Sequence, residues 1–533
     1  MTVEERPDPT VGEMHPQRWG DPAAAAPLSE AARGLVELAF GLEQRPPVAA
    51  PELPPPALGA DLLDGLRALV GADHVHTDDA TRRLRTRGKS TPDLLRARSG
   101  DLADAPDAVV RPDGPAQVAA VLAYAVERHF AVVPFGGGTS VTGGLAARRE
   151  GYAGLVSLDL VRMKRLLALD ETSMTATLEP GLRGPEAEQL LARHGLTLGH
   201  YPQSFEHATI GGFAATRSSG QASAGYGRFD AMVVGLTVAT PRGPLVLGSA
   251  PAGAAGPDLR QLLLGSEGTL GVITSVTVRV RRAPTASAYE GWRWRSFADG
   301  VAAMRTLAQA GLLPTVLRLG DETETAINLA EPGAIGAAAG GAGGCLMVTG
   351  YEGEPATVRA RRVAVTAVLE GLGGTPLGEE PGRSWRAGRF AAPYLRDAML
   401  DVGVLVETLE TATFWSRAPA VYDAVRSALT ASLGEPTMVL CHVSHVYETG
   451  CSLYFTVATR QGERPVERWL AAKAAASDAL LAAGATITHH HAVGTDHVPW
   501  LARELGPVGV GILRAVKAEL DPTGILNPGV LVP

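Results

Sequence analysis

The stretch VVPFGGGTSVTGG, Val132–Gly144, decides the fold class of this chain. It begins with an apolar run of the kind that forms a buried strand, and three consecutive glycines follow directly. Because glycine has no Cβ, it adopts positive φ readily, and successive backbone N–H groups then point into one concavity that suits a pyrophosphate. The spacing matches neither the Rossmann nor the Walker motif. Taken alone, such a cluster is more often a plain glycine turn.

Two more segments have a similar composition, rich in glycine, serine and threonine, and they weaken the interpretation as a plain turn. They are QSFEHATIGGFAATRSSG, residues 203–220, and LGSEGTLGVI, residues 264–273, and the second again runs into a strand-like stretch. Three loops rich in glycine, serine and threonine within one domain can surround a large cofactor that carries phosphate groups. Together they favour a cofactor site over three unrelated turns.

The sequence around the glycines alternates strand-like and helical patterns. The apolar run DAVVRP is followed by helical periodicity over residues 115–130 and by a second apolar run at 131–135. Strand–helix–strand is the signature of an α/β layer. Further strand-like runs continue to Pro284, so we predict one mixed α/β domain over residues 106–284.

Three other regions complete the chain. Residues 1–105 are predicted to be helical, with a stiff Pro-rich linker at 44–60. Residues 285–484 alternate helices and strands more loosely, which indicates a second, α+β domain. Within it the Gly/Ala-rich stretch 332–351 favours a flexible loop. Residues 485–533 form a C-terminal segment with one helix. The predicted class is α/β (α+β).

Composition and charge narrow the class of protein. The formal net charge is −8 at pH 7, which argues against a nucleic-acid partner because such proteins usually need a basic face. Three cysteines without regular spacing indicate no disulfide framework. Residues 1–22 are polar and lack a signal-peptide pattern, and no stretch suits a membrane span, so we expect a cytoplasmic protein. Heavy use of Ala, Gly and Arg is typical of a GC-rich bacterial genome.

A histidine triplet stands out near the C-terminus, within ATITHHHAVG. The stretch looks like a strand, in which His489 and His491 would share one face and His490 the other. A His-x-His pair on a strand can bind zinc, and CHVSH, residues 441–445, with Cys451 offers further ligands, but at no recognised zinc spacing. We therefore favour a cofactor pocket over a metal site. One functional histidine with two packed neighbours is an alternative within that hypothesis.

These motifs carry a resemblance to a known family. The order PFGGGTS, GLVSLDLVRM, LEPG, IGGFAATRSSG, GSEGTLGVIT and ILNPG resembles the FAD-binding domain of vanillyl-alcohol-oxidase and p-cresol-methylhydroxylase flavoproteins. Within that superfamily the chain resembles alkyldihydroxyacetonephosphate synthases, through RWGDP, VLRLGD, APYLRDAML, VETLETATFW, CSLYF and HHHAVG. The resemblance spans nearly the whole chain after residue 80. It implies a two-subdomain FAD-binding domain, a cap domain, and helical segments at both ends.

The resemblance implies a set of FAD contacts. The glycine loop would hold the pyrophosphate, and the other two segments would line the rest of the cofactor. The loop contains no histidine, which some relatives use there to attach FAD covalently, so we expect non-covalent FAD. The implied residues are Pro134, Phe135, Gly136, Gly137, Gly138, Thr139, Ser140, Gln203, Ser204, Phe205, Glu206, His207, Ala208, Thr209, Thr216, Arg217, Ser218, Ser219, Glu267, Gly268, Thr269, Leu270, Gly271, Val272 and Ile273.

The resemblance also implies an active site built from the second half of the chain. Where relatives read HHHGVGK, this chain has Ala492 and Thr495, so a cation is missing there. The implied residues are the acid/base Tyr454, the phosphate-binding Arg396, and Arg318, His489, His490 and His491.

Two of these residues have plainer explanations. An arginine fork pairs bidentately with phosphate, but without the resemblance a surface ion pair of Arg396 with Asp397 or Asp401 is favoured. A tyrosine acts as a base only where neighbouring cations stabilise its phenolate, because its free pKa is about 10. Without the resemblance, Tyr454 is favoured as a core aromatic in an apolar strand.

The implied reaction is redox-neutral. The acyl group of acyl-dihydroxyacetone phosphate would be exchanged for a long-chain alcohol through a flavin N5 adduct, which makes an ether lipid. The alternative in the same fold is an FAD-dependent oxidase or dehydrogenase of a 2-hydroxy acid or alcohol, since an arginine also binds a carboxylate. A third alternative, a non-catalytic or metal-binding protein, predicts a colourless preparation.

The resemblance also bears on partners. We expect a small-molecule or lipid-like phosphate ester as substrate, and such a lipid requires at least transient contact with a membrane surface. Relatives often dimerise, so we expect a homodimer, with Trp19 and its neighbours as candidates for the contact.

Overall fold

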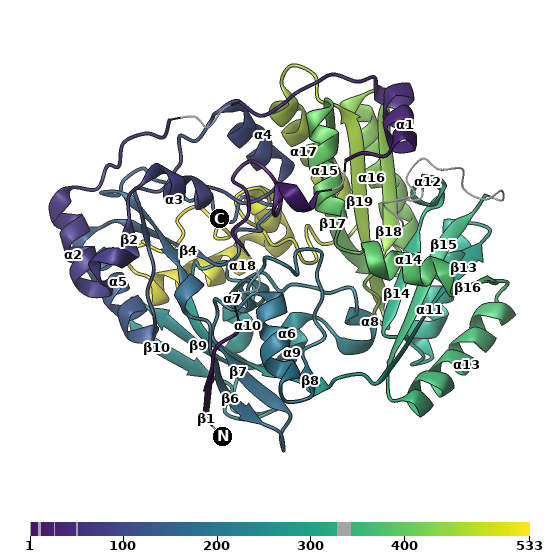
Figure 1. Cartoon of the computed structure of the whole chain (residues 1–533), viewed down its shortest axis with the longest axis horizontal. Helices are drawn as coiled ribbons and strands as arrows, with labels where there is room; N and C mark the ends of the chain where they lie inside the picture. Colours follow the sequence, from purple (N-terminus) through teal and green to yellow (C-terminus); the bar gives the residue numbers. More distant parts are fainter. Residues whose placement is uncertain (1, 9–11, 26, 49–51, 328–342) are drawn as a thin grey trace.

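The computed structural model describes residues 2–8, 12–25, 27–48, 52–327 and 343–533. Its strands form sheets of six, seven and four strands and one two-stranded pair. Figure 1 shows two parts side by side: the four- and six-stranded sheets lie in one, and the seven-stranded sheet with its helices forms the other. The long C-terminal helix, in yellow, returns to the first part. The structure has the mixed α/β architecture that the sequence predicts.

The four-stranded sheet carries the glycine loop. Its order is β2, β3, β5, β4, and both β3 and β4 run parallel to β5. Helix α5 (Pro115–Arg128) connects β3 to β4, as the strand–helix–strand pattern predicts. Helix α2 (Ala60–Val70) packs on α5, so this layer includes residues before 106. The strands are β2 (Val75–His76), β3 (Ala108–Val110), β4 (Ala131–Phe135) and β5 (Leu155–Asp159).

The six-stranded sheet is antiparallel, in the order β1, β6, β7, β11, β9, β10. Helices α6 (Gly184–Ala192) and α7 (Ile210–Ala215) share its apolar core, and this packing brings the N-terminal end of α7 beside the glycine loop. The N-terminal strand β1, which pairs with β6, was not predicted. The strands are β1 (Thr2–Glu5), β6 (Leu166–Asp170), β7 (Thr175–Leu178), β9 (Val233–Thr240), β10 (Gly243–Leu247) and β11 (Val272–Arg279).

The seven-stranded sheet is antiparallel, in the order β16, β13, β15, β14, β18, β19, β17. Four helices share one apolar core with it: α11 (Phe297–Gln309), α13 (Pro355–Gly371), α16 (Ala418–Leu433) and α17 (Pro465–Ala482). The strands are β13 (Ala286–Trp294), β14 (Val316–Gly320), β15 (Cys345–Gly353), β16 (Thr375–Gly378), β17 (Val404–Phe414), β18 (Thr437–Val443) and β19 (Gly450–Arg460).

Side-chain alternation along β19 decides what the seven-stranded sheet presents on each face. Leu453 and Phe455 enter the helix-covered core, whereas Tyr454, Thr456 and Ala458 face the opposite way and line a cavity. A strand points successive side chains to opposite faces, so an apolar strand can still offer one polar residue to a site. The interpretation of Tyr454 as a core aromatic is therefore wrong.

The C-terminal segment closes on the glycine loop. Helix α18 (Val498–Leu520) is kinked at Gly506, where φ is 67°, and the chain then returns so that Leu526 pairs in parallel with Val132 of β4. The side-chain amide of Asn527 donates to the carbonyls of Gly144 (2.9 Å) and Glu267 (2.7 Å). The ILNPG motif thus joins two of the three loops.

Two local predictions fail. The stretch before and within the histidine triplet is a bent loop and not a strand, because the three N–H groups of the triplet bond to the side chain of Glu410 and not to a neighbouring strand. Of the predicted flexible loop at 332–351, residues 332–342 lie outside the described residues, and Cys345–Gly353 forms strand β15, paired on both sides.

The described part of the Pro-rich linker runs along the body of the protein. The N–H of Arg45 donates to the carbonyl of Asp401 (2.8 Å), and that of Val48 donates to Arg98 (2.9 Å). The three cysteines are buried and unpaired. Among the described helices, none has the length and apolar character needed to cross a membrane.

Candidate active site

A cavity of about 440 Å³ lies where the two parts of the molecule meet. Its size is that of a ligand pocket. One wall is the glycine loop with the start of α7, and the opposite wall is the inward face of β17, β18 and β19. The implied FAD contacts that line it are Pro134, Phe135, Gly136, Gly137, Gly138, Thr139, Ser140, Gln203, Ser204, Ala208, Thr209, Thr216, Ser218, Ser219, Glu267, Gly268, Gly271 and Ile273.

The glycine loop leaves no room for side chains. A Cβ on Gly137 would lie 2.1 Å from the carbonyl oxygen of His207, and one on Gly136 would lie 2.4 Å from Oγ1 of Thr209. Gly138 has φ of +69°, which side chains rarely allow. The backbone therefore approaches the cavity closely, as a diphosphate cradle requires.

A second feature of the cavity fits a bound polar group. Nε2 of Gln203 is buried at the cavity wall, and no described residue accepts a hydrogen bond from it. Buried polar groups are normally paired, so this amide N–H is available to a ligand.

The remaining implied contacts lie behind this wall. Arg217 pairs with Asp230 (2.9 Å) and donates to the carbonyl of Leu264 (3.0 Å), so it ties two cofactor loops together. The ring of Phe205 stacks on Phe390 at 5.5 Å. The others that do not line the cavity are Glu206, His207, Thr269, Leu270 and Val272. A direct role for these residues in binding FAD stays a prediction.

Glu267 connects the cofactor loops to the histidine loop, residues 485–494. Its buried carboxyl accepts the N–H groups of Val493 and Gly494, each at 3.0 Å. Burial raises the pKa of Glu267 to about 7, although these two backbone donors act in the opposite direction.

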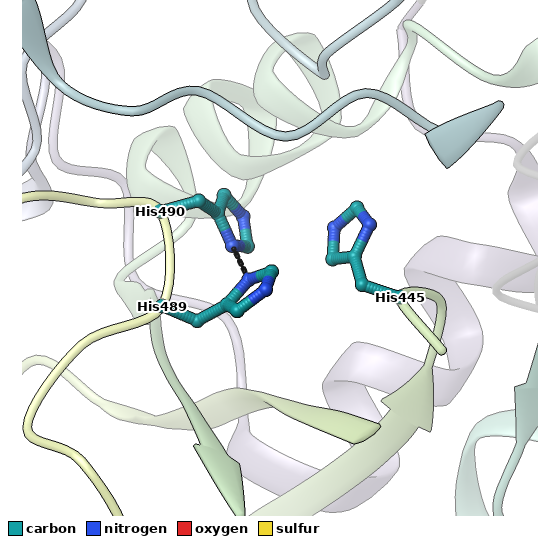
Figure 2. A group of neighbouring side chains, drawn as sticks. All are labelled: His445, His489 and His490. Atoms are coloured by element: carbon teal, nitrogen blue, oxygen red, sulfur yellow. Dashed lines mark hydrogen bonds between the residues drawn. The ribbon is translucent and has the colours of Figure 1, made fainter. Parts of the chain in front are cut away.

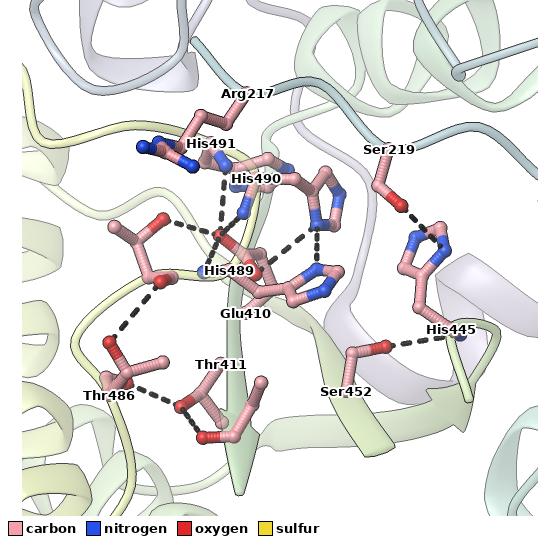
Figure 3. A network of polar contacts seen from close by, with 12 residues as sticks. Arg217, Ser219, Glu410, Thr411, His445, Ser452, Thr486, His489, His490 and His491 are labelled. Carbon is pink, nitrogen blue, oxygen red and sulfur yellow. Dashed lines mark hydrogen bonds and ion pairs between the residues drawn. The ribbon is translucent and has the colours of Figure 1, made fainter. Parts of the chain in front are cut away.

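One carboxylate shapes the histidine loop. The buried side chain of Glu410, on β17, accepts the N–H groups of His489, His490 and His491 at 2.8 to 3.1 Å, and the hydroxyl of Thr488 at 2.6 Å (Figure 3). Burial favours the protonated acid, but the three imidazoles, His490 first, hold the pKa of Glu410 well below its usual range. The loop is therefore wrapped around an anion.

The imidazoles themselves form a hydrogen-bonded cluster. Nδ1 of His489 lies 2.9 Å from Nδ1 of His490 (Figure 2). Nδ1 of His445 lies 2.7 Å from the hydroxyl of Ser223. The hydroxyl of Tyr447 bonds Nε2 of His489. Burial holds the pKa of His445 and of His489 well below the usual range, so both are neutral at pH 7. His490 lines the cavity and His489 supports it from behind.

The zinc alternative can be compared with this geometry. Nitrogens of His445, His489 and His490 lie within 4.8 Å of one another. Two nitrogens on a tetrahedral zinc are about 3.3 Å apart, given bond lengths of about 2.0 Å. The Nδ1 atoms of His489 and His490, 2.9 Å apart, are closer than that and lie at hydrogen-bond distance. The 4.8 Å limit for the three residues is wider than the zinc spacing. The geometry therefore favours a hydrogen-bonded cluster over a formed metal centre.

Tyr454 lies among three imidazole rings at the cavity wall. Its ring stacks on His442 (4.8 Å) and on His490 (6.0 Å), and meets His491 edge-on at 5.4 Å. Burial raises the pKa of Tyr454 to about 12, with a smaller contribution from the nearby carboxylates of Glu407 and Glu410, and a hydrogen bond with Thr408 and the cation of Arg396 oppose this shift only in part. Burial also lowers the pKa of His491 to about 3. At pH 7 the phenol is therefore a proton donor, and the neighbouring imidazole is a neutral acceptor.

Arg318 reaches the cavity from β14. It pairs with the buried Glu324 at 2.8 Å, and its Nη2 lies 3.1 Å from Nδ1 of His442. Because His442 stacks on Tyr454, this ion pair orients the ring next to the predicted acid/base.

Arg396 lines the cavity from helix α15 (Ala392–Asp401). Its Nη2 pairs with Asp397 at 3.2 Å, as the plainer hypothesis requires, but its side chain is only 11% exposed. The pair is thus buried at the cavity wall and is not a surface ion pair.

The cavity has an apolar arm that runs away from the polar cluster. Helix α1 (Glu30–Phe40), helix α15 and the ends of β17, β18 and β19 supply its walls. Its lining residues are Leu28, Ala32, Leu35, Val36, Phe40, Leu395, Met399, Val406, Met438, Leu440 and Ala458.

Comparisons with known proteins agree with this arrangement. Residues 106–248 match the family model for the FAD binding domain, and residues 283–531 match that for the C-terminal domain of FAD linked oxidases. The alkyldihydroxyacetonephosphate synthase of Trypanosoma brucei brucei is 34% identical over 505 residues, which cover 90% of this chain and 82% of that protein. This chain belongs to the alkyldihydroxyacetonephosphate synthase family.

Solved structures support the same grouping. A structure of an alkyldihydroxyacetonephosphate synthase aligns with a TM-score of 0.81 at 28% identity, over 97% of this chain and 99% of that chain. p-Cresol methylhydroxylase with bound substrate aligns with a TM-score of 0.69 at 17% identity, over 89% and 98%, which shows a shared fold alone. The predicted fold of the p-cresol-methylhydroxylase type is confirmed.

Three site residues of this synthase-family chain were not assigned to the active site from sequence: Glu410, His442 and His445. A signal for Glu410 was present, since VETLETATFW places two acids within an otherwise apolar and threonine-rich strand. His442 and His445 were considered only as metal ligands. Neither signal reveals that these residues lie beside the triplet in the folded chain.

Proposed function

We propose that this chain is an FAD-dependent alkyldihydroxyacetonephosphate synthase that exchanges the acyl group of an acyl-dihydroxyacetone phosphate for a long-chain alcohol. The observation that carries the proposal is the single cavity that joins the glycine cradle, the Tyr454–imidazole cluster and the apolar arm. Family membership supports the same reaction.

The apolar arm separates this reaction from oxidation of a 2-hydroxy acid. A small hydroxy acid needs one cation and the flavin, and gains nothing from an aliphatic channel. A fatty acyl or alkyl chain gains about 0.8 kcal/mol for each CH₂ that it buries. The apolar arm beside α1 therefore favours a substrate with a long chain.

The described residues supply binding and proton transfer. Bound FAD supplies an electron-accepting ring. Arg396 binds the phosphate, which places the carbon that bears the ester beside the cluster. His491 is neutral and accepts a proton, and Tyr454 is protonated and donates one at its Oη. Glu410 holds the acceptor loop in place through the backbone.

The exchange balances without an external oxidant or reductant. One carbon–oxygen bond to the fatty acid breaks and one to the alcohol forms at the same carbon. The alcohol releases its hydroxyl proton, and the departing carboxylate and that proton account for the fatty acid. No electrons are gained or lost overall.

The test is an incubation of the oxidised, yellow protein with acyl-dihydroxyacetone phosphate and labelled hexadecanol under nitrogen. The expected product is a labelled alkyl ether with one fatty acid released per ether formed. Absence of the labelled ether would defeat the proposal. Bleaching of the flavin by a 2-hydroxy acid in the same preparation would favour the oxidoreductase.

Tyr454→Phe sharpens this test because it removes one hydroxyl and keeps the ring. Turnover is expected to fall by about 10²–10⁴-fold, the usual contribution of a positioned proton donor, while the visible flavin spectrum is retained. Tyr124→Phe is the matched control, since that hydroxyl lies beside α2, where it donates to the carbonyl of Asp61, and Tyr124 does not line the cavity. Equal activity of Y454F and wild type would remove Tyr454 from the mechanism.

Three further features belong to the proposal. FAD is held non-covalently, which predicts that acid precipitation leaves all flavin in the supernatant.

The chain touches membranes transiently through α1, whose Leu38 is 86% exposed beside the apolar arm. Flotation with lipid vesicles measures this contact. A homodimer is measured by light scattering, but Trp19 cannot form its contact because it is 4% exposed within one chain.

A further inference from the structure

An N-terminal strap, residues 15–20, crosses helix α15 next to Arg396. Arg18 forms a two-bond ion pair with Asp401 (2.8 and 2.9 Å), and the N–H of Trp19 donates to the carboxylate of Asp397 (2.5 Å). Gly20 has φ of +54°, and a Cβ there would lie 2.2 Å from the hydroxyl of Tyr394. The strap is therefore closely packed on α15, although the two segments are far apart in the sequence.

The strap forms part of the cavity wall. Trp19 lines the cavity and is 4% exposed, and its ring meets His207 edge-on at 5.6 Å. No described residue accepts a hydrogen bond from its indole N–H, although that nitrogen is buried. Leaving a buried N–H without a partner is unfavourable, so a ligand that accepts a hydrogen bond from it gains affinity.

Arg396 presents an open edge to the same cavity. Nε and Nη2 donate to Asp397 at 3.3 and 3.2 Å, and Nη1 donates to the carbonyl of Lys89 at 2.6 Å. A guanidinium carries five N–H bonds, so one on each terminal nitrogen is left over. No described residue accepts these two, and together they form the fork that binds a phosphate bidentately.

Lys89 and Asp397 connect the strap to this fork. Nζ of Lys89 donates to the carbonyls of His15 (2.6 Å) and Pro16 (3.2 Å), while its own carbonyl accepts from Arg396. Its backbone N–H donates to the carbonyl of Ser140 in the glycine loop at 2.7 Å. Asp397 accepts from Arg396 and from Trp19. The strap, the fork and the cofactor loop thus share one set of bonds.

We propose that the strap is part of the substrate site: Trp19 donates its indole N–H to the phosphate of the substrate, and Asp397 and Lys89 are positioning residues that aim Arg396 at the same phosphate. The inference rests on the proposed function, because that function supplies a phosphate ester. It assigns a substrate-binding role to a segment far in sequence from every residue of the catalytic cluster.

The test is the binding of dihydroxyacetone phosphate to the FAD-loaded protein, measured by titration calorimetry. Trp19→Phe keeps a ring and loses the N–H, and it is expected to weaken binding about tenfold or more, the worth of a hydrogen bond to a charged group, with flavin content unchanged. Trp500→Phe is the matched control, because its indole N–H bonds the exposed Asp478 and no substitution effect is expected.

Positioning is tested by a double-mutant cycle. Asp397→Asn and Lys89→Met are each expected to weaken binding of dihydroxyacetone phosphate, and both effects are expected to shrink in an Arg396→Lys background, because they act through the fork. A purely structural role would weaken binding equally in both backgrounds and would overturn the positioning claim. Unchanged binding in W19F would overturn the role of the strap.

These outcomes are separate from those of the proposed function. Binding of dihydroxyacetone phosphate requires no turnover. A wild-type protein that makes no ether but binds this phosphate in a Trp19-dependent way refutes the reaction and supports the strap. One that makes ether while W19F binds normally refutes the strap alone.

Discussion

The glycine loop and the histidine loop both contribute walls to one cavity, and they are built in opposite ways. The glycine loop is a property of contiguous sequence: β4 ends, and three residues without Cβ turn the backbone toward the ligand. The histidine loop takes its shape from a distant side chain, because three successive N–H groups bond to the carboxylate of Glu410. The first wall holds a cofactor with backbone, and the second presents side chains for chemistry.

The largest expected effect comes from adding a side chain to the glycine loop. In Gly137→Ala the new methyl would lie 2.1 Å from the carbonyl of His207, so the loop must move and the cradle is lost. We expect colourless protein without activity, measured by flavin absorbance per polypeptide. Gly114→Ala is the control, because a Cβ there meets nothing within 4 Å. A yellow, active G137A would show that the cradle is not built as described.

The next effect comes from the carboxylate that organises the other wall. Glu410→Gln replaces one acceptor oxygen by a donor that faces backbone N–H groups, so the loop loses its shape. We expect turnover to fall about 100-fold and the free energy of unfolding to fall by about 3 kcal/mol, with FAD retained. Glu504→Gln is the matched control: it bonds Thr486 and Ile487 of the same loop from an exposed position. Loss of FAD in E410Q would contradict the assignment of cofactor binding to the glycine loop and of catalysis to the histidine loop.

A smaller effect, a difference in kcat, is expected between substitutions of different histidines of the triplet. His490 and His491 line the cavity, whereas His489 lies behind them, bonded to Tyr447 and His490. We therefore expect His491→Asn to lower kcat about tenfold more than His489→Asn does. Equal losses of kcat, compared at saturating substrate, would mean that the three imidazoles act as one unit.

The smallest effect concerns the residue that joins the two walls. Burial raises the pKa of Glu267 to about 7 from the ordinary 4.5, so the folded protein holds a proton that the unfolded chain releases. This contribution to stability is full below pH 4.5 and is lost as the pH rises to about 7. Thermal unfolding midpoints of wild type are expected to fall across that range, and those of Glu267→Gln to fall less. Unfolding midpoints that change with pH in the same way in both proteins would contradict the raised pKa of Glu267.

The same contrast explains what the sequence could predict. The glycine loop, α5 and β4 follow from local patterns, and the structure has them where the patterns indicate. The triplet was recognised, but the strand predicted for it was wrong, because Glu410 replaces the neighbouring strand as hydrogen-bond partner. The strap was missed as a cavity wall for a similar reason: Trp19 and Asp397 are separated by 378 residues. Contacts of that kind leave no local signature.

The most direct measurement follows the visible flavin band of the oxidised protein in the absence of oxygen while acyl-dihydroxyacetone phosphate and hexadecanol are consumed. The account predicts that the band has its starting intensity once the substrates are exhausted, after many ether molecules per flavin. Permanent loss of the band after a single turnover, restored only by an electron acceptor, would contradict it.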